Sequence, residues 1–243
     1  MAQVRLNKFL ARSGVASRRH ADNLIRQGRV KINGILVKQL GTQVLDDGGD
    51  LVEVDGQIVS PEKGSFYLMM NKPTGYLVST RDPHHKRLVT SLLKGYKGKV
   101  FPIGRLDYDS SGLLLFTNDG NLAFRLSHPR FKVSKTYEVI CEGLISDENL
   151  TKLNEGVILD DGLTAPANTA LINKGDNFSQ VQITIHEGRK RQVRRMFELV
   201  GHPVKSLKRV SFGNLRLGNL AEGSFIQLKR GQLKQLRSLV GMK

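Results

Sequence analysis

A polar loop between two apolar stretches carries the residues best suited to chemistry. Residues 104–112 read Gly-Arg-Leu-Asp-Tyr-Asp-Ser-Ser-Gly, and the apolar run 113–116 follows. Asp107 and Asp109 could simply be turn residues that bond their own backbone. Two features favour catalysis by Asp107. Arg105 could hold its carboxylate ionised, and the apolar run would mount the loop at a rigid strand end. An ionised carboxylate held in this way can attack a carbon atom or stabilise one that becomes positive.

A second segment concentrates positive charge. Five of the seven residues 189–195 are Lys or Arg, and residues 186–209 hold eight basic side chains against two acidic ones. The spacing of the apolar residues predicts a helix over 190–200 that docks on a core through Val193, Met196, Phe197 and Val200. So many cations near the positive end of a helix dipole are unfavourable, and an outside anion or an internal carboxylate would relieve them. A solvated basic face is the alternative.

Metal and redox chemistry have little support in the sequence. The single cysteine, Cys141, excludes an internal disulfide and a zinc site with two or more Cys ligands. Cys141 lies in an apolar alternating stretch, so a buried inert thiol is a better interpretation than a nucleophile. The six histidines are scattered. We therefore expect neither a metal site nor a cofactor.

The overall charge points to a polyanionic partner. The 243 residues include 39% hydrophobic ones, enough for a core, and carry a net charge of +16. Nucleic acid is the first candidate partner and an anionic membrane surface the second. The chain has no apolar run of about 18 residues and no signal-peptide pattern, so we expect a cytoplasmic protein.

Positive charge is densest in a small N-terminal module. Helices are predicted over residues 5–13 and from Ser17 to Gly28, followed by a hairpin that turns at residues 33–34. Residues 1–40 hold nine Lys or Arg and one acid, whereas a merely solvated surface normally mixes both signs. Phosphate binding is therefore favoured. The candidate RNA contacts of this module are Arg5, Lys8, Arg12, Arg18, Arg19, Arg26 and Arg29.

The remaining chain predicts a larger α+β domain. Strands outnumber helices and do not alternate with them regularly, which favours a mainly antiparallel mixed sheet over a doubly wound one. The clearest strands are residues 66–70, 135–141 and 180–186, and the clearest helices are 121–126 and 190–200. A short polar turn-forming segment separates the two parts. The predicted organisation is residues 1–59 as an RNA-binding domain, 60–65 as a linker and 66–243 as a catalytic domain.

Two known families resemble these segments. Arg18-Arg19, Leu24-Ile25, Gly28-Arg29-Val30 and Asn33-Gly34 resemble the αL RNA-binding module named after a small-subunit ribosomal protein, which holds structured RNA by shape and phosphates. The larger domain resembles the ribosomal RNA pseudouridine synthases of the small-subunit synthase A and large-subunit synthase B family. The matching segments are 104–107, 111–120, 191–196, 135–137 and, more weakly, 71–75.

The resemblance implies roles for individual residues. Asp107 becomes the catalytic carboxylate, and Arg194 is implied to pair with it and hold it ionised. Some family members carry Lys at the position of Arg194, which implies that its charge matters more than its shape. Tyr137 is implied to stack on the target base and to act in proton steps, although an aromatic residue filling the core is the alternative. Leu207 is implied to pack against the base.

The resemblance also implies the substrate. The family breaks the C–N glycosidic bond of uridine, turns the base and joins C5 to C1′, and the carboxylate could attack either the sugar or the base ring. The target base must leave the RNA stack, which phosphate contacts could support. The candidate RNA contacts of the larger domain are Lys72, Arg105, Arg189, Lys190 and Arg191.

The predicted function is therefore site-specific isomerisation of uridine to pseudouridine in ribosomal RNA or a pre-ribosomal particle. We expect a monomer without a metal or a small-molecule cofactor. The runs 108–111 and 191–195 resemble the large-subunit enzymes more than the small-subunit one. The alternatives are a non-catalytic protein that binds ribosomal RNA or assists ribosome assembly, and a hydrolytic N-glycosylase.

Overall fold

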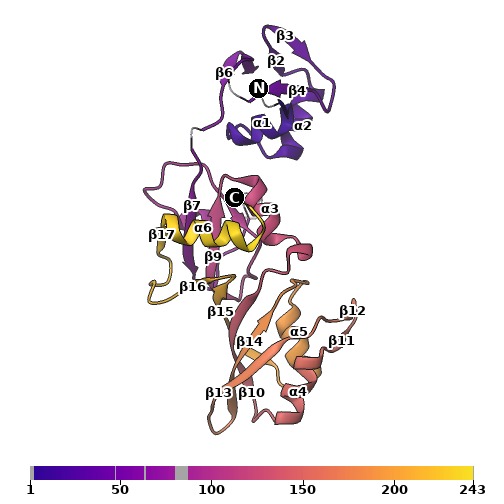
Figure 1. Ribbon diagram of the computed structural model, residues 1–243, viewed down its shortest axis with the longest axis vertical. Coiled ribbons are helices and arrows are strands. Elements are labelled where there is room, and N and C mark those ends of the chain that lie inside the picture. The colour runs from indigo at the N-terminus through magenta and orange to yellow at the C-terminus, as the bar shows by residue number, and fades with distance from the viewer. Residues whose placement is uncertain (1–2, 47, 63, 80–86, 243) are drawn as a thin grey trace. The chain divides into compact units, whose positions relative to one another are not determined.

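The computed structural model describes residues 3–46, 48–62, 64–79 and 87–242. The chain divides into two compact units, shown in Figure 1. One unit comprises Met1–Ser65 with Lys97–Lys99, and the other comprises Phe66–Tyr96 with Val100–Lys243. Each unit has its own hydrophobic core.

The first unit packs two short helices against small sheets. Strands β3, β2, β5 and β6 pair in that order, and β1 pairs with β4. Its elements are β1 (Gln3–Arg5), α1 (Leu6–Arg12), α2 (Arg18–Arg26), β2 (Val30–Ile32), β3 (Ile35–Val37), β4 (Gln43–Leu45), β5 (Val52–Val54) and β6 (Gln57–Val59). The buried core consists of one face of each helix and the inward strand residues, as the helical spacing predicts.

Local sequence signals set the turns of the first unit. The Ser17 side chain caps α2 by accepting from the backbone N–H of His20. Asn33 and Gly34 adopt positive φ angles of 51° and 81°, which is the backbone conformation of a tight two-residue hairpin turn. The predicted helix–helix–hairpin arrangement is confirmed.

A mixed sheet dominates the second unit. Its strands run in the order β13-β14-β10-β15-β9-β7-β17, with β16 beside β15 and β8 beside β9. The pairings are antiparallel except for β15 with β9. The predicted α+β fold with a mainly antiparallel mixed sheet is confirmed. β11 and β12 pair with each other in a separate two-stranded sheet. The strands of the second unit are β7 (Tyr67–Lys72), β8 (Phe101–Ile103), β9 (Ser111–Thr117), β10 (Lys135–Glu142), β11 (Ile158–Leu159), β12 (Gly162–Leu163), β13 (Asn168–Lys174), β14 (Phe178–Ile185), β15 (Val204–Phe212), β16 (Leu215–Arg216) and β17 (Phe225–Gln227).

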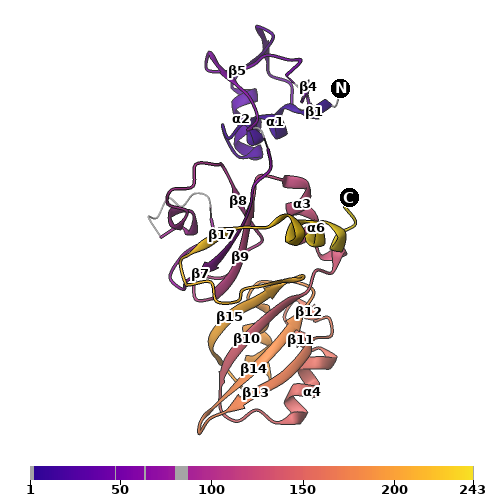
Figure 2. The same cartoon turned by 60° about the vertical axis from the view of Figure 1, so that its left-hand side comes forward.

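Helices cover both faces of this sheet, as Figure 2 shows. Leu68 and Met70 of β7 face a core that contains residues of α4 and α5, whereas Tyr67 and Met69 face a second core built with α3 and α6. This alternation follows the two-residue period of a strand. The helices are η1 (Val89–Leu92), α3 (Gly120–Ser127), η2 (Pro129–Phe131), α4 (Asp147–Glu155), α5 (Gln192–Leu199) and α6 (Arg230–Leu239).

Two sequence expectations meet the structure here. Cys141 is buried and free, and burial raises the pKa of its thiol, which fits the inert core residue that we predicted. The helix predicted from residue 190 begins two residues later, because Arg191 adopts a left-handed conformation with φ of 51°. Among the described residues, no helix combines the length and the apolar character that crossing a membrane requires.

Candidate active site

The loop between β8 and β9 is fastened through its backbone. Lys72, the last residue of β7, is fully buried, and its Nζ donates to the carbonyl oxygens of Asp107 at 3.1 Å and Ser110 at 2.7 Å. It also donates to the carbonyl of Pro73 at 3.0 Å. A single ammonium group thus holds both ends of the tight turn 107–110, since an ammonium offers three donors.

Two further residues hold the middle of this turn. The backbone N–H of Gly75 donates to the Tyr108 carbonyl at 2.8 Å. Arg194 of α5 donates from Nη2 to the Asp109 carbonyl at 2.9 Å. The four successive carbonyls of residues 107–110 are therefore all bonded, and the turn has little freedom to shift.

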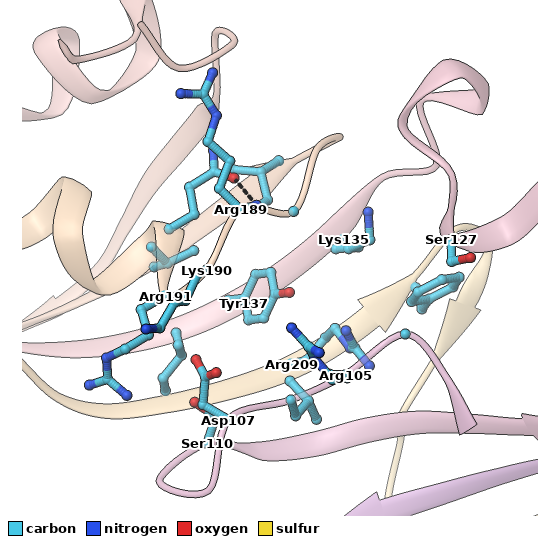
Figure 3. Close-up of a pocket in the computed structure, with 18 residues that line it drawn as sticks. Arg105, Asp107, Ser110, Ser127, Lys135, Tyr137, Arg189, Lys190, Arg191 and Arg209 are labelled. Carbon is cyan, nitrogen blue, oxygen red and sulfur yellow. Dashed lines mark hydrogen bonds between the residues drawn. The ribbon is translucent and has the colours of Figure 1, made fainter. Parts of the chain in front are cut away.

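The carboxylate of Asp107 is left available by this arrangement. Within the described residues it forms neither a hydrogen bond nor an ion pair, and it faces a cavity of about 400 Å³. Figure 3 shows the carboxylate pointing into this space. The cavity is lined by Gly104, Arg105, Leu106, Asp107, Ser110, Ser127, Lys135, Tyr137, Ile185, Gly188, Arg189, Lys190, Arg191, Gln192, Val193, Leu207, Arg209 and Phe212.

The other predicted catalytic side chains come from neighbouring strands. Tyr137 of β10 lies opposite Arg209 of β15, and Val139 lies opposite Leu207. Tyr137 and Leu207 both line the cavity and are 8% and 6% exposed. The structure thus brings the predicted trio of carboxylate, aromatic ring and apolar side chain to one cavity, although the chain separates them widely.

The predicted ion pair between Arg194 and Asp107 is not what the structure shows. The Nε of Arg194 lies 3.3 Å from the carboxylate of Asp109, and its Nη1 donates to the Val204 carbonyl at 3.0 Å. Asp109 also receives two hydrogen bonds from Arg191, at 3.1 and 3.0 Å. Burial opposes ionisation of Asp109, but these bonds and charges outweigh it and lower its pKa. Arg194 interacts with Asp107 only by longer-range electrostatic attraction.

Two residues predicted to bind RNA have structural duties instead. Lys72 is 0% exposed and is committed to the loop carbonyls, so it cannot reach a phosphate. Burial lowers its pKa to about 8, against the opposing effect of the charges on Asp109 and Asp107. The guanidinium of Arg189 donates to the carbonyls of Gly162 and Leu163 in the β11–β12 hairpin. A charged side chain at the end of a strand or helix gives no sign in the sequence of such distant partners.

Internal carboxylates relieve the basic start of α5, one of the two possibilities that we predicted. Asp161 forms ion pairs with Arg195 at 3.0 Å and Arg189 at 3.4 Å. Asp109 forms ion pairs with Arg191 and Arg194. Lys190 forms no ion pair within the described residues and remains exposed at the cavity.

The basic residues of the first unit differ in how free they are. Arg12 forms an ion pair with Asp46, and Arg29 forms one with Asp55. Arg26 donates to the side chain of Asn23 at 3.1 Å. Five of the predicted RNA contacts in this unit are exposed and form no ion pair within the described residues: Arg5, Lys8, Arg18, Arg19 and Arg26.

Sequence reasoning missed several residues of the cavity wall. Lys135 and Arg209 line it from β10 and β15, and the buried hydroxyl of Ser110 lines it beside Asp107. Lys135 and Tyr137 lie two positions apart in a strand, a spacing that could have marked Lys135. Arg209 carried no such signal, because its place opposite Tyr137 depends on strand pairing.

This arrangement of fold and cavity matches one family of enzymes. The family model described as RNA pseudouridylate synthase matches residues 66–199, and an S4 domain model matches residues 4–52. The chain belongs to the RNA pseudouridylate synthase family, whose members are isomerases.

Individual relatives support this assignment over the whole chain. An uncharacterised RNA pseudouridine synthase of Aquifex aeolicus is 43% identical, with 100% of this chain and 97% of that protein covered. The ribosomal large subunit pseudouridine synthase B of Bacillus subtilis is 45% identical, with 97% and 96% covered. A solved pseudouridylate synthase structure is 32% identical, covers 96% of this chain and 99% of its own, and superposes with a TM-score of 0.69.

Proposed function

We propose that this enzyme converts a specific uridine of large-subunit ribosomal RNA to pseudouridine, with Asp107 as the catalytic carboxylate. The observation that carries the proposal is the unpaired carboxylate of Asp107 on a fully bonded turn, facing a cavity that Tyr137 and Leu207 also line. The choice of the large subunit is supported by the names of the Bacillus subtilis and Vibrio cholerae relatives.

The cavity residues fit the steps of this reaction. The uridine must be flipped out of the RNA stack to enter the cavity. The Asp107 carboxylate then attacks the sugar carbon C1′ or the base ring, and the C–N bond breaks. After the base turns, C5 bonds to C1′ and the bond to the Asp107 oxygen breaks, which regenerates the carboxylate. The C5 proton then leaves, while N1 gains a proton. In this proposal the ring of Tyr137, which lines the cavity, stacks on the base and its hydroxyl takes part in proton transfer.

The S4 module supplies a second RNA contact in this proposal. Arg18 and Arg19 begin α2, are exposed and form no ion pair within the described residues. Arginine side chains in this state are available to phosphate oxygens. We propose that they bind structured ribosomal RNA near the target, with Arg5 and Lys8 of the same unit.

Tritium release tests the reaction and the role of Asp107 together. Large-subunit and small-subunit ribosomal RNA transcripts labelled with tritium at uridine C5 are incubated separately with the protein. We expect release from the large-subunit transcript with the base retained in the chain. Asp107→Asn should abolish release, because the amide is neutral and cannot act as the nucleophile, while RNA affinity stays close to that of the wild type.

The controls separate the competing functions. Asp176→Asn changes an exposed acid in the β13–β14 turn and should leave release unchanged. Release of free uracil would identify an N-glycosylase, and RNA binding without release would identify a non-catalytic RNA-binding protein. Full release by Asp107→Asn would overturn the catalytic assignment, and release from the small-subunit transcript alone would overturn the choice of subunit.

A further inference from the structure

One wall of the cavity contains a buried guanidinium with an unused donor. Arg209 is 1% exposed, and its Nε donates to the Leu113 carbonyl at 2.7 Å. Its Nη2 is buried without any hydrogen-bond partner in the described structure. A buried charged group with an unsatisfied donor costs stability. Because this donor lies at a cavity, we infer that a bound ligand supplies the missing hydrogen-bond acceptor.

A second cation lies on the same wall. The Nζ of Lys135 donates to the carbonyls of Val133 at 3.1 Å and Glu187 at 3.4 Å, which leaves one of its three donors. Lys135 and Arg209 both approach the ring of Phe212, at 5.8 and 5.2 Å from its centroid. Burial and the positive charge of Arg209 lower the pKa of Lys135 to about 8, against the attraction of Glu187.

Neither cation forms an ion pair with a carboxylate in the described part of the chain, although Glu187 attracts Lys135 from a longer distance. Within the described residues, Lys135, Arg209 and the exposed Arg105 of the same cavity form no ion pair, although the nearby basic helix start is paired at almost every position. Two like charges side by side in a buried wall repel each other. An anion bound between them would remove the repulsion and accept the unused donors.

We propose that Arg209 and Lys135 form a binding site for one phosphodiester group of the RNA substrate, next to the nucleotide whose base is isomerised. This inference rests on the proposed function. In Figure 3, Tyr137 lies between Asp107 and Lys135, so a nucleotide stacked on the tyrosine would place its sugar near the carboxylate and a backbone phosphate near the cations. A phosphodiester carries the permanent charge and the paired acceptor oxygens that a guanidinium and an ammonium bind best.

Single neutral linkages test this site. The target uridine is first located by running the tritium assay on progressively shorter transcripts. Short RNAs containing it are then made with one methylphosphonate linkage, which removes one negative charge, at each position around the target. Their affinities are measured with the inactive Asp107→Asn protein, with and without a second change, Arg209→Gln. In the parent protein we expect one linkage whose neutralisation weakens binding by about tenfold, as for a lost hydrogen bond to a charged group.

The effect of the same linkage should shrink to about twofold once Arg209→Gln is present, because only Lys135 of the two cations is then left to bind the phosphate. Arg216→Gln, an exposed arginine of β16, is the matched control and should keep the tenfold effect. Lys135→Met serves as the second test variant if Arg209→Gln unfolds, since Lys135 is only partly buried whereas Arg209 is 1% exposed. A linkage effect that is equal in parent and variant proteins would overturn the proposal. Normal turnover with no sensitive linkage would also overturn it, whereas absence of tritium release would instead reject the proposed function.

Discussion

Arg194 acts on the backbone around Asp107, the proposed catalytic residue, and not on the Asp107 carboxylate. Its three nitrogen atoms reach the Val204 carbonyl, the Asp109 carbonyl and the Asp109 carboxylate. This use of the full guanidinium fork differs from the expectation that a point charge suffices. Arg194 is therefore a positioning residue for the turn that carries Asp107.

Arg194→Lys should lower kcat by about 100-fold and change KM little, because an ammonium cannot span these partners and small displacements at a reacting centre are costly. Initial rates of tritium release with RNA in excess over enzyme give kcat at saturating RNA, and their dependence on RNA concentration gives KM. Arg195→Lys alters an arginine whose ion pair is with Asp161 and should behave like the wild type. Full kcat in Arg194→Lys would show that charge alone suffices.

Lys135 should make RNA binding depend on pH. In the free protein its pKa is lowered to about 8, and a phosphate beside it favours the charged form. Binding therefore takes up a proton once the pH exceeds the free pKa, and affinity falls as pH rises above about 8. The loss of RNA affinity at high pH should approach about tenfold for each unit by which the bound phosphate raises the pKa of Lys135.

Fluorescence anisotropy with the Asp107→Asn protein at constant ionic strength measures this profile. Lys135→Arg remains charged throughout and should show a flatter profile over the same range. An identical fall in Lys135→Arg would assign the pH dependence to another group.

At the scale of elements, the parallel junction of β9 and β15 determines where the site residues meet. Gly112 is paired with Arg209 and has φ of 105°. A Cβ atom there would lie 2.6 Å from the backbone N and 2.9 Å from the backbone C of Arg209. The close approach of the two strands therefore requires glycine at this position.

Gly112→Ala should destabilise the protein by more than about 2 kcal/mol, because both the backbone conformation and the contact become strained. Urea unfolding followed by circular dichroism gives the free energy of unfolding. Gly120→Ala is the matched control, since Gly120 begins α3 with no atom within 4 Å of the added Cβ and without a positive φ. Equal stability of the two variants would contradict this account.

Elements with local signals were predictable, and contacts between distant segments were not. Asn33-Gly34 and the Ser17 cap act within a few residues, so sequence patterns reveal them. Lys72 instead bonds carbonyls 35 and 38 residues away, and the sequence showed only a lysine after an apolar strand. The positions of Asp107, Tyr137 and Leu207 at one cavity followed from family resemblance, because residue spacing alone does not determine strand pairing.

At the scale of the whole molecule, the net charge of +16 is only partly available to RNA. Arg12 and Arg29 are paired with carboxylates within the first unit, and Asp109 and Asp161 offset part of the charge at the start of α5 within the second. Counterion release from RNA should therefore depend on the exposed cations without ion pairs, such as Arg18 and Arg19, and the total charge overestimates it.

Arg18→Ala with Arg19→Ala should therefore weaken RNA binding and reduce the slope of log affinity against log salt by about 1 to 2. Filter binding across a salt series gives the slope. Arg29→Ala removes a cation already paired with Asp55 and should leave the slope nearly unchanged. A wild-type slope in the double variant would remove these arginines from the interface.

The parallel pairing of β15 with β9 has a consequence for biosynthesis. The turn that holds Asp107 is completed by Arg194, 85 residues after the Asp109 carbonyl to which it bonds, and by β15, which is synthesised later still. Contacts of such long range form late, and a chain emerging from the ribosome folds from its N-terminus. The S4 module can thus fold on the nascent chain while the catalytic cavity is still unformed. The enzyme can become active only after almost all of its chain has been translated.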